Sequence, residues 1–180
     1  FIGMSTWGYV GMRIAIRRPD LLKSLVLMDT SAEAEDKKTL KEYNLLLWIL
    51  KNIGWFPVIG QVMPKLFHKS FLRDKSRQAE VRKWMTIVKA QNKKGIIPFA
   101  KGIFYRDGVL EKLSDISIPT AVIVGEKDVA TPPECGKRMA DRIPNAAFYK
   151  IQDAGHSAAV EKPKEVADAI RDFYIKIKVM

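Results

Sequence analysis

The sequence contains one cysteine, two histidines and no long uncharged apolar run. A single cysteine, Cys135, cannot form a disulfide within the chain. The longest apolar stretch, residues 44–60, is interrupted by Lys51 and Pro57. It is therefore too short for a helix that spans a bilayer, which needs about 20 apolar residues. We expect a protein without disulfides or stable membrane insertion, and the scarcity of cysteine favours a reducing, cytoplasmic location.

Residue groups that hold metals or nucleotides are also missing from the sequence. No cluster of histidine, cysteine and acidic residues has the spacing of a metal site. No glycine-rich phosphate loop or dinucleotide fingerprint is present. His68 follows Leu66 and Phe67 in an apolar context, and we interpret it as a surface or pocket-lining residue. These absences predict a protein with no metal and no cofactor.

Acidic residues are the scarcer charge, with 20 against 31 basic residues, for a net charge of +11. Such a balance can indicate a nucleic-acid partner. The lysines and arginines are scattered, however, and often stand beside acids, as in residues 33–38 and 161–165. No basic and aromatic interleave of the kind that stacks bases is present. We therefore expect a solvated basic surface and no nucleic-acid partner.

Short apolar runs alternate with helical patterns in two parts of the chain. Residues 24–29, 120–125 and 147–151 are rich in branched or aromatic residues and are typical of buried strands. Residues 9–18, 133–142 and 163–176 show helical spacing. Strands separated by helices of this length indicate a parallel sheet flanked by helices. The predicted fold class is α/β.

Residues from about 33 to 113 follow a different pattern. Their apolar residues recur at helical spacing and are interrupted by Gly54, Pro57 and Gly95, with no credible strand between them. This pattern predicts about four helices inserted into the sheet domain. The expected organisation is a core formed by residues 1–32 and 114–180, with a helical cap formed by residues 33–113.

The first six residues combine a strand end, a Gly-x-Ser turn and the start of a helix. A serine hydroxyl is a weak nucleophile until a base activates it. A tight turn from strand to helix would project Ser5 above the sheet, with the N–H of Thr6 facing a developing oxyanion. Gly-x-Ser occurs in many ordinary turns, so this segment alone leaves a structural serine equally open.

Two further residues carry the chemistry that such a serine needs. Asp128 follows the strand at 120–125, and His156 follows the strand at 147–151. Ligands of open α/β sheets bind at the carboxyl ends of the strands. Asp128 alone could be a helix N-cap and His156 alone a loop histidine. A serine, an acid and a histidine in this order, each after a strand, make Ser5, Asp128 and His156 candidates for a catalytic triad.

These residues stand in longer motifs that resemble the α/β-hydrolase superfamily, in particular its small capped esterases and enol-lactone hydrolases. The similar stretches are residues 3–8, 18–29, 118–132 and 154–163, so the resemblance covers nearly the whole chain. The resemblance implies that Ser5 attacks an acyl carbon and that His156 takes its proton. It also implies that Asp128 orients the imidazole and that water resolves the acyl-enzyme.

The chain departs from the family pattern in two ways. Trp7 occupies a position that is normally a glycine, because the elbow brings helix and strand close together. Trp7 could line the pocket, plug it or redirect the serine. The family also builds several strands before the nucleophile, and a loop among them supplies a second oxyanion donor. We expect these 180 residues to be the C-terminal two-thirds of such a hydrolase.

The sequence therefore predicts a serine hydrolase that cleaves a small, largely apolar carboxylic ester or lactone through an acyl-enzyme on Ser5. Trp7, Trp48, Trp55 and Phe56 are candidates for an apolar pocket, or the insert's apolar residues simply bury it. The alternative is a non-catalytic relative that folds as a homo-oligomer or with a missing N-terminal segment. A weaker alternative is a protein that binds a membrane surface through residues 44–67 and its positive charge.

Overall fold

The chain folds into two compact units in the computed structural model, which describes residues 1–178. The first, here called the sheet unit, comprises Phe1–Glu33 and the chain from Gly108 onward. The second, the helical unit, comprises Ala34–Asp107. Each unit is described by itself below. No helix among residues 1–178 is long and apolar enough to cross a membrane.

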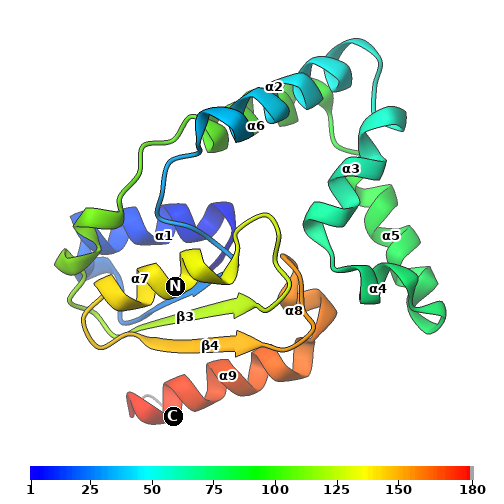
Figure 1. Ribbon diagram of the computed structural model, residues 1–180. Helices are drawn as coiled ribbons and strands as arrows, with labels where there is room; N and C mark the ends of the chain where they lie inside the picture. Colours follow the sequence, from blue (N-terminus) through cyan, green and yellow to red (C-terminus); the bar gives the residue numbers. More distant parts are fainter. Residues whose placement is uncertain (179–180) are drawn as a thin grey trace. The chain divides into compact units, whose positions relative to one another are not determined.

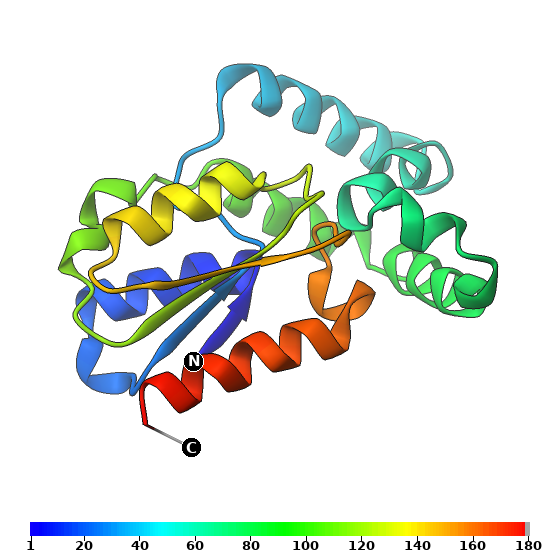
Figure 2. The ribbon, with the colours of Figure 1, turned by 60° about the horizontal axis from the view of Figure 1, so that its bottom comes forward.

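The sheet unit is built on four parallel strands in the order β1-β2-β3-β4. Helices α1 and α7 cover one face of the sheet and α9 covers the other (Figures 1 and 2). The predicted α/β class is therefore confirmed. The strands are β1 (Ile2–Met4), β2 (Leu25–Met28), β3 (Thr120–Gly125) and β4 (Ala147–Ile151); the helices are α1 (Thr6–Arg17), α7 (Pro133–Arg142), α8 (Ala158–Glu161) and α9 (Pro163–Lys176), with short 3₁₀ segments η1 (Pro19–Leu21) and η3 (Leu110–Asp115).

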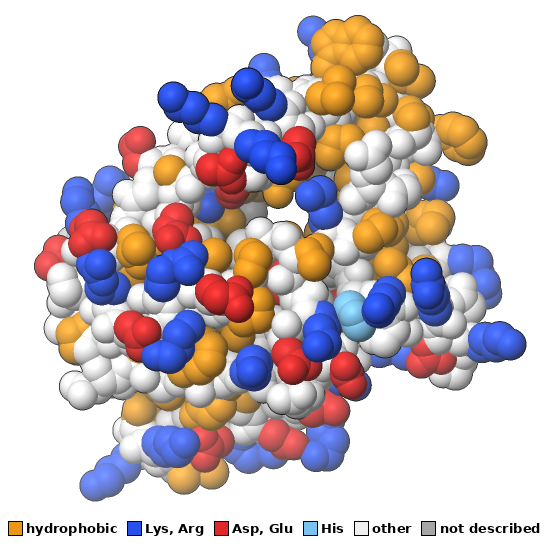
Figure 3. Space-filling view, in the orientation of Figure 1, with side chains coloured by type: hydrophobic (Ala, Val, Ile, Leu, Met, Phe, Trp, Pro, Cys, Tyr) orange, Lys and Arg blue, Asp and Glu red, His pale blue; other side chains and the backbone are white. Residues whose placement is uncertain are grey.

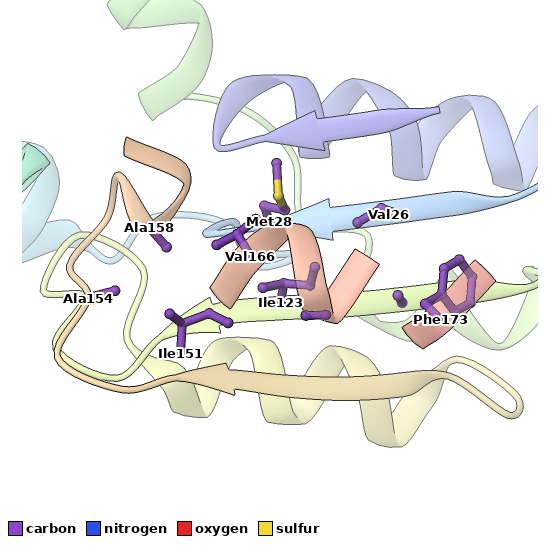
Figure 4. Close-up of a cluster of buried hydrophobic side chains, with 10 residues drawn as sticks. Val26, Met28, Ile123, Ile151, Ala154, Ala158, Val166 and Phe173 are labelled. Atoms are coloured by element: carbon purple, nitrogen blue, oxygen red, sulfur yellow. The ribbon is translucent and has the colours of Figure 1, made fainter. Parts of the chain in front are cut away.

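Strands β2 and β3 are buried along their whole length, as continuous apolar runs in a parallel sheet should be. Side chains from both strands pack against α9 in a cluster that includes Val26, Ile123 and Phe173 (Figure 4). Burying a side chain of this size contributes about 1.5–3 kcal/mol to folding. This core fixes the carboxyl ends of β2, β3 and β4, from which the loops of the site emerge.

The helical spacing seen from Tyr9 extends back to Thr6, so α1 starts directly after Ser5, as the strand, turn and helix pattern of the first residues predicted. The short helix α8 was not predicted, because four residues are too few to show a helical period. Strand β1 forms one edge of the sheet. The side chains of Ile2 in this strand and of Trp7 in α1 are exposed.

The helical unit contains five α-helices, one more than the sequence predicted. The additional one is the five-residue α4, which follows a loop and buries Phe71 against Phe67. The unit's small core also includes Leu50 and Met63. Its elements are α2 (Lys37–Asn52), α3 (Phe56–Leu66), α4 (Lys69–Arg73), η2 (Lys75–Arg77), α5 (Gln78–Lys89) and α6 (Lys93–Phe104).

Polar side chains cap the N-termini of several of these helices. The carboxylate of Asp36 accepts hydrogen bonds from the N–H groups of Lys38 and Thr39 at the start of α2. Nδ1 of His68 accepts a hydrogen bond from the N–H of Ser70 at the start of α4. The prediction for His68 was therefore incomplete: this half-buried residue is a helix N-cap, a role that the sequence did not reveal because histidine is an uncommon cap.

Candidate functional site

Ser5 occupies a turn between β1 and α1 with a strained backbone. Its φ is 51° and its ψ is −115°, which is rare for a residue with a side chain. Three hydrogen bonds hold the turn: the N–H of Ser5 donates to the carbonyl of Met28 at 2.9 Å, and its own carbonyl accepts from Gly8 N–H at 2.9 Å and from the hydroxyl of Thr30 at 2.8 Å. Strain of this kind persists only where the surroundings enforce it, and it is common at functional sites.

Glycines supply the space that this turn needs. A Cβ on Gly3 would lie 2.6 Å from the backbone carbonyl of Trp7, and one on Gly8 would lie 2.5 Å from the methyl group of Thr30. Helix and strand therefore approach closely, as expected. The close approach involves the backbone of Trp7 and not its side chain, which is 63% exposed. The bulky residue is accommodated at the usual glycine position by pointing away from the close contact.

His156 lies in the loop between β4 and α8 and is only 6% exposed. Its Nε2 is 2.9 Å from Oγ of Ser5, and its Nδ1 is 2.8 Å from Oδ2 of Asp128. Because the carboxylate oxygen accepts, Nδ1 carries the hydrogen, and Nε2 of the neutral ring is free to accept the Ser5 hydroxyl proton. The structure thus brings all three predicted triad residues together in one hydrogen-bonded chain.

Asp128 is held from several sides in the loop after β3. Its Oδ1 accepts the N–H groups of Ala130 at 2.8 Å and Thr131 at 3.0 Å. Its Oδ2 accepts the Thr131 hydroxyl at 2.7 Å in addition to the His156 ring. Asp128 therefore binds N–H groups of the turn that follows it and also faces the histidine. Thr131 is a positioning residue that the sequence analysis did not single out.

The electrostatics of the site favour a positively charged imidazole. Burial disfavours the charged ring of His156, but the hydrogen bond and charge of Asp128 outweigh it, with smaller contributions from Asp29 and Glu161. The net effect raises the pKa of His156 above its ordinary value. A higher pKa makes the ring a stronger base and stabilises the imidazolium that forms when it takes a proton.

Asp29 is a second buried acid, at the end of β2, and is only 1% exposed. Its Oδ1 accepts the N–H of Gly125 at 2.8 Å and its Oδ2 accepts the N–H of Ala158 at 3.2 Å. It therefore joins the loop that carries Asp128 to the segment that carries His156. Burial, reinforced by the charge of Asp128, raises the pKa of Asp29 to about 7.

The loops after β3 and β4 touch each other directly. A Cβ on Gly125 would lie 2.2 Å from the carbonyl oxygen of Gly155, so only glycine fits there. The N–H of Lys127 donates to the carbonyl of Ala154 at 2.8 Å, and that of Gly155 donates to the carboxylate of Glu161 at 3.1 Å. These contacts preorganise the acid and the histidine. Sequence reasoning missed Asp29 and Glu161; for Asp29 the signal was an acid directly after β2, at the same end of the sheet as the loop after β3 that carries Asp128.

Thr6, the predicted oxyanion donor, is the first residue of α1 and directly follows Ser5. The first N–H groups of an α-helix have no acceptor within the helix, and the helix dipole makes this end positive. The structure therefore puts the Thr6 N–H at the end of a helix that favours negative charge. Its role towards an oxyanion stays a prediction.

The remaining pocket candidates belong to the helical unit. Trp48 on α2 is 59% exposed and Phe56 at the start of α3 is 89% exposed. Trp55 is half-buried, and its indole N–H donates to the carbonyl of Gln91 at 3.2 Å. Their part in a pocket stays a prediction. Within residues 1–178 no group of three or more His, Cys, Asp and Glu side chains is placed to hold a metal ion.

Comparison with known proteins gives consistent results. A family model described as the alpha/beta hydrolase fold matches residues 1–163. Among curated proteins, an uncharacterized hydrolase of Bacillus subtilis, YugF, is 24% identical over 179 residues, which are 96% of this chain and 63% of that protein.

Solved structures show the same similarity. A thermophilic esterase from Thermogutta terrifontis superposes with a TM-score of 0.86 at 29% identity, covering 98% of this chain and 64% of that one. The enol-lactonase from Burkholderia xenovorans superposes with a TM-score of 0.87 at 20% identity, covering 97% and 65%. The chain therefore spans somewhat less than two thirds of the length of each of these proteins.

Proposed function

Because the chain belongs to the α/β-hydrolase fold family, we propose that it carries the catalytic residues of a serine hydrolase that cleaves a small, largely apolar carboxylic ester or lactone. The single observation that supports this most is the continuous chain from Ser5 Oγ through the His156 ring to the Asp128 carboxylate, with distances of 2.9 Å and 2.8 Å. Nucleophile, base and orienting acid at hydrogen-bond distance are the arrangement that acyl transfer requires.

In the proposed reaction, the Ser5 hydroxyl attacks the acyl carbon while Nε2 of His156 accepts its proton. Asp128 keeps Nδ1 protonated and stabilises the imidazolium. The N–H of Thr6 donates to the oxyanion. His156 then returns the proton to the leaving alkoxide, which leaves an acyl group on Ser5. A water molecule, deprotonated by His156, hydrolyses this acyl-enzyme and regenerates the serine.

The substrate class rests on the comparisons and on the apolar character of the helical unit. Two of the similar structures are an esterase and an enol-lactonase by their descriptions. Thr6 is the only oxyanion donor that we assign within this chain. Since loss of one donor costs about 3–4 kcal/mol of transition-state stabilisation, both acylation and hydrolysis of the acyl-enzyme should be slower than in a site with two donors.

The test is hydrolysis of p-nitrophenyl butyrate by the purified chain, with peptide mass spectrometry of the quenched reaction. The proposal predicts a burst of p-nitrophenol, a butyryl group on Ser5, and loss of both in Ser5→Ala. Ser114→Ala is the matched control, because this exposed serine only donates to the carbonyl of Glu111. A chain that is folded but never acylated would instead support the non-catalytic alternative.

A further inference from the structure

The net positive charge of this protein is concentrated almost entirely in the helical unit. Residues 34–107 contain sixteen Lys and Arg but only six Asp and Glu, a net charge of +10. The rest of the chain contains fifteen basic and fourteen acidic residues, a net charge of +1. A charge divided in this way creates a local positive field, which attracts an anionic partner to one part of the molecule.

The same unit exposes large apolar side chains that its own core leaves uncovered. On α2, Leu45 and Trp48 lie one turn apart and are each 59% exposed. At the turn into α3, Ile53 is 66% exposed and Phe56 is 89% exposed. Figure 3 shows hydrophobic side chains gathered over the end of α2 and the start of α3, with Lys and Arg beside them. We call these four residues, Leu45, Trp48, Ile53 and Phe56, the apolar strip.

Lysines flank the apolar strip on the same helix. Lys41 lies one turn before Leu45, and Lys51 lies one turn after Trp48; both are exposed. Lysine side chains can lay their apolar stems along a lipid surface while the ammonium groups reach the headgroups. Tryptophan is enriched at the boundary between lipid headgroups and acyl chains. Apolar and cationic groups on one face are typical of helices that lie in that boundary.

We propose that the apolar strip and its flanking lysines, on α2 and the turn to α3, bind the surface of an anionic phospholipid bilayer. Trp48 and Phe56 enter the headgroup region, and Lys41 and Lys51 contact lipid phosphates. A second copy of this chain is a poorer occupant, because two units of +10 repel each other. A nucleic acid would use the positive charge but has no need of Leu45 and Ile53. The proposal assigns Trp48 and Phe56, two of the residues first predicted for a pocket, to a lipid surface instead, and it goes beyond the proposed hydrolase activity.

The experiment is flotation of the purified chain with vesicles of phosphatidylcholine containing 30 mol% phosphatidylglycerol, compared with phosphatidylcholine alone. We expect binding to the anionic vesicles that weakens as salt is raised, with a blue shift of tryptophan fluorescence. Trp48→Ser with Phe56→Ser, and separately Lys41→Gln with Lys51→Gln, should each weaken binding by about tenfold or more, since each basic residue near such a surface contributes on the order of 1 kcal/mol.

Matched control variants come from the sheet unit. Leu21 and Ile175 are also exposed, at 61% and 56%, so Leu21→Ser with Ile175→Ser removes two exposed apolar side chains from the sheet unit. Lys23→Gln with Lys150→Gln removes the same charge from exposed positions. All controls, and Ser5→Ala, should bind as the parent does, and circular dichroism checks that each variant is folded.

Three results would overturn the proposal. One is no binding to anionic vesicles at low salt by the folded chain. Another is binding that the sheet-unit controls weaken as much as the apolar-strip variants. The third is a dimer, detected by analytical ultracentrifugation, that Trp48→Ser with Phe56→Ser dissociates, because a second copy would then cover the strip. Loss of esterase activity without loss of vesicle binding would count only against the proposed function.

Discussion

The two units of this molecule use charge in opposite ways. In the sheet unit, acidic and basic residues nearly balance, and the titratable groups at the site are buried: Asp29, Asp128, His156 and Glu161 are all less than 9% exposed. Each has hydrogen-bond partners at fixed positions, because a buried charge without partners is costly. In the helical unit, a net charge of +10 lies mainly on the surface. The comparison suggests that the sheet unit is built for chemistry at one point and the helical unit for attraction over a wide area.

The comparison is tested most strongly by removing the base. His156→Ala should reduce acylation of Ser5 by about 10⁴-fold, because the nucleophile, base and acid act as one unit. Replacing the other histidine, as His68→Ala, should leave the acylation rate within about twofold, since that side chain caps α4 in the helical unit. The measurement is the p-nitrophenol burst rate; equal losses for the two histidines would contradict the assignment.

The pH dependence of the acylation rate is expected to be a smaller effect than the loss of His156, but it also distinguishes the two units. The base must be neutral, and its pKa is raised above the ordinary 6.5. The acylation rate should therefore rise with pH to a midpoint above 6.5 and fall about tenfold for each unit below that midpoint. Vesicle binding does not use His156, so it should show no such midpoint. A flat acylation profile would exclude His156 as the base.

Removal of Asp29 tests the framework of the site. Asp29→Ala leaves the buried N–H groups of Gly125 and Ala158 without their carboxylate, so we expect a loss of about 2–4 kcal/mol in the free energy of unfolding. Acylation of Ser5 should fall about tenfold as the two loops loosen. Urea denaturation and the burst rate are the measurements. Asp20→Ala, at an exposed position, is the control and should change neither.

The raised pKa of Asp29 adds a pH signature to the same variant. Its folded pKa of about 7 lies above the ordinary value of 3.8, so the protonated form is favoured in the folded state. Its stabilising contribution is complete below about pH 4 and is lost as pH rises through 7. Asp29→Asn should remove that part of the pH dependence, which urea denaturation at several pH values detects.

Much of the sheet unit was predictable from local sequence. The apolar runs at β3 and β4 gave the strand bounds, and the glycine before Ser5 and the acids and histidine after the strands indicated the site. The start of α1 directly after Ser5 was also predicted, although Trp7 stands where a glycine was expected. Asp29 was missed because its partners, Gly125 and Ala158, are 96 and 129 residues away, and no local pattern reveals such contacts.

The helical unit was less predictable. Its insertion and helical character followed from the apolar spacing and the lack of strands. The short helix α4 and the capping role of His68 did not, because one helical turn shows no period. The division of charge between the units was also missed, because the sequence analysis considered only the total of +11 and did not count charges within the predicted insert.

The smallest expected effect concerns Trp7. Its side chain is 63% exposed and points away from the close contact at Gly3, so Trp7→Ala should change the acylation rate of Ser5 by no more than about twofold. The measurement is again the burst rate with p-nitrophenyl butyrate. A rate increase of tenfold or more would mean that the ring obstructs the serine.

The most direct test of the central claim is covalent labelling of the chain with a serine-reactive fluorophosphonate, located by peptide mass spectrometry. We predict a single label on Ser5 in the parent chain, and a labelling rate that is lost in His156→Ala while circular dichroism stays unchanged. Labelling of Ser5 that is equally fast without His156, or a label on another serine, would contradict the account, because the hydroxyl would then not be activated by this histidine.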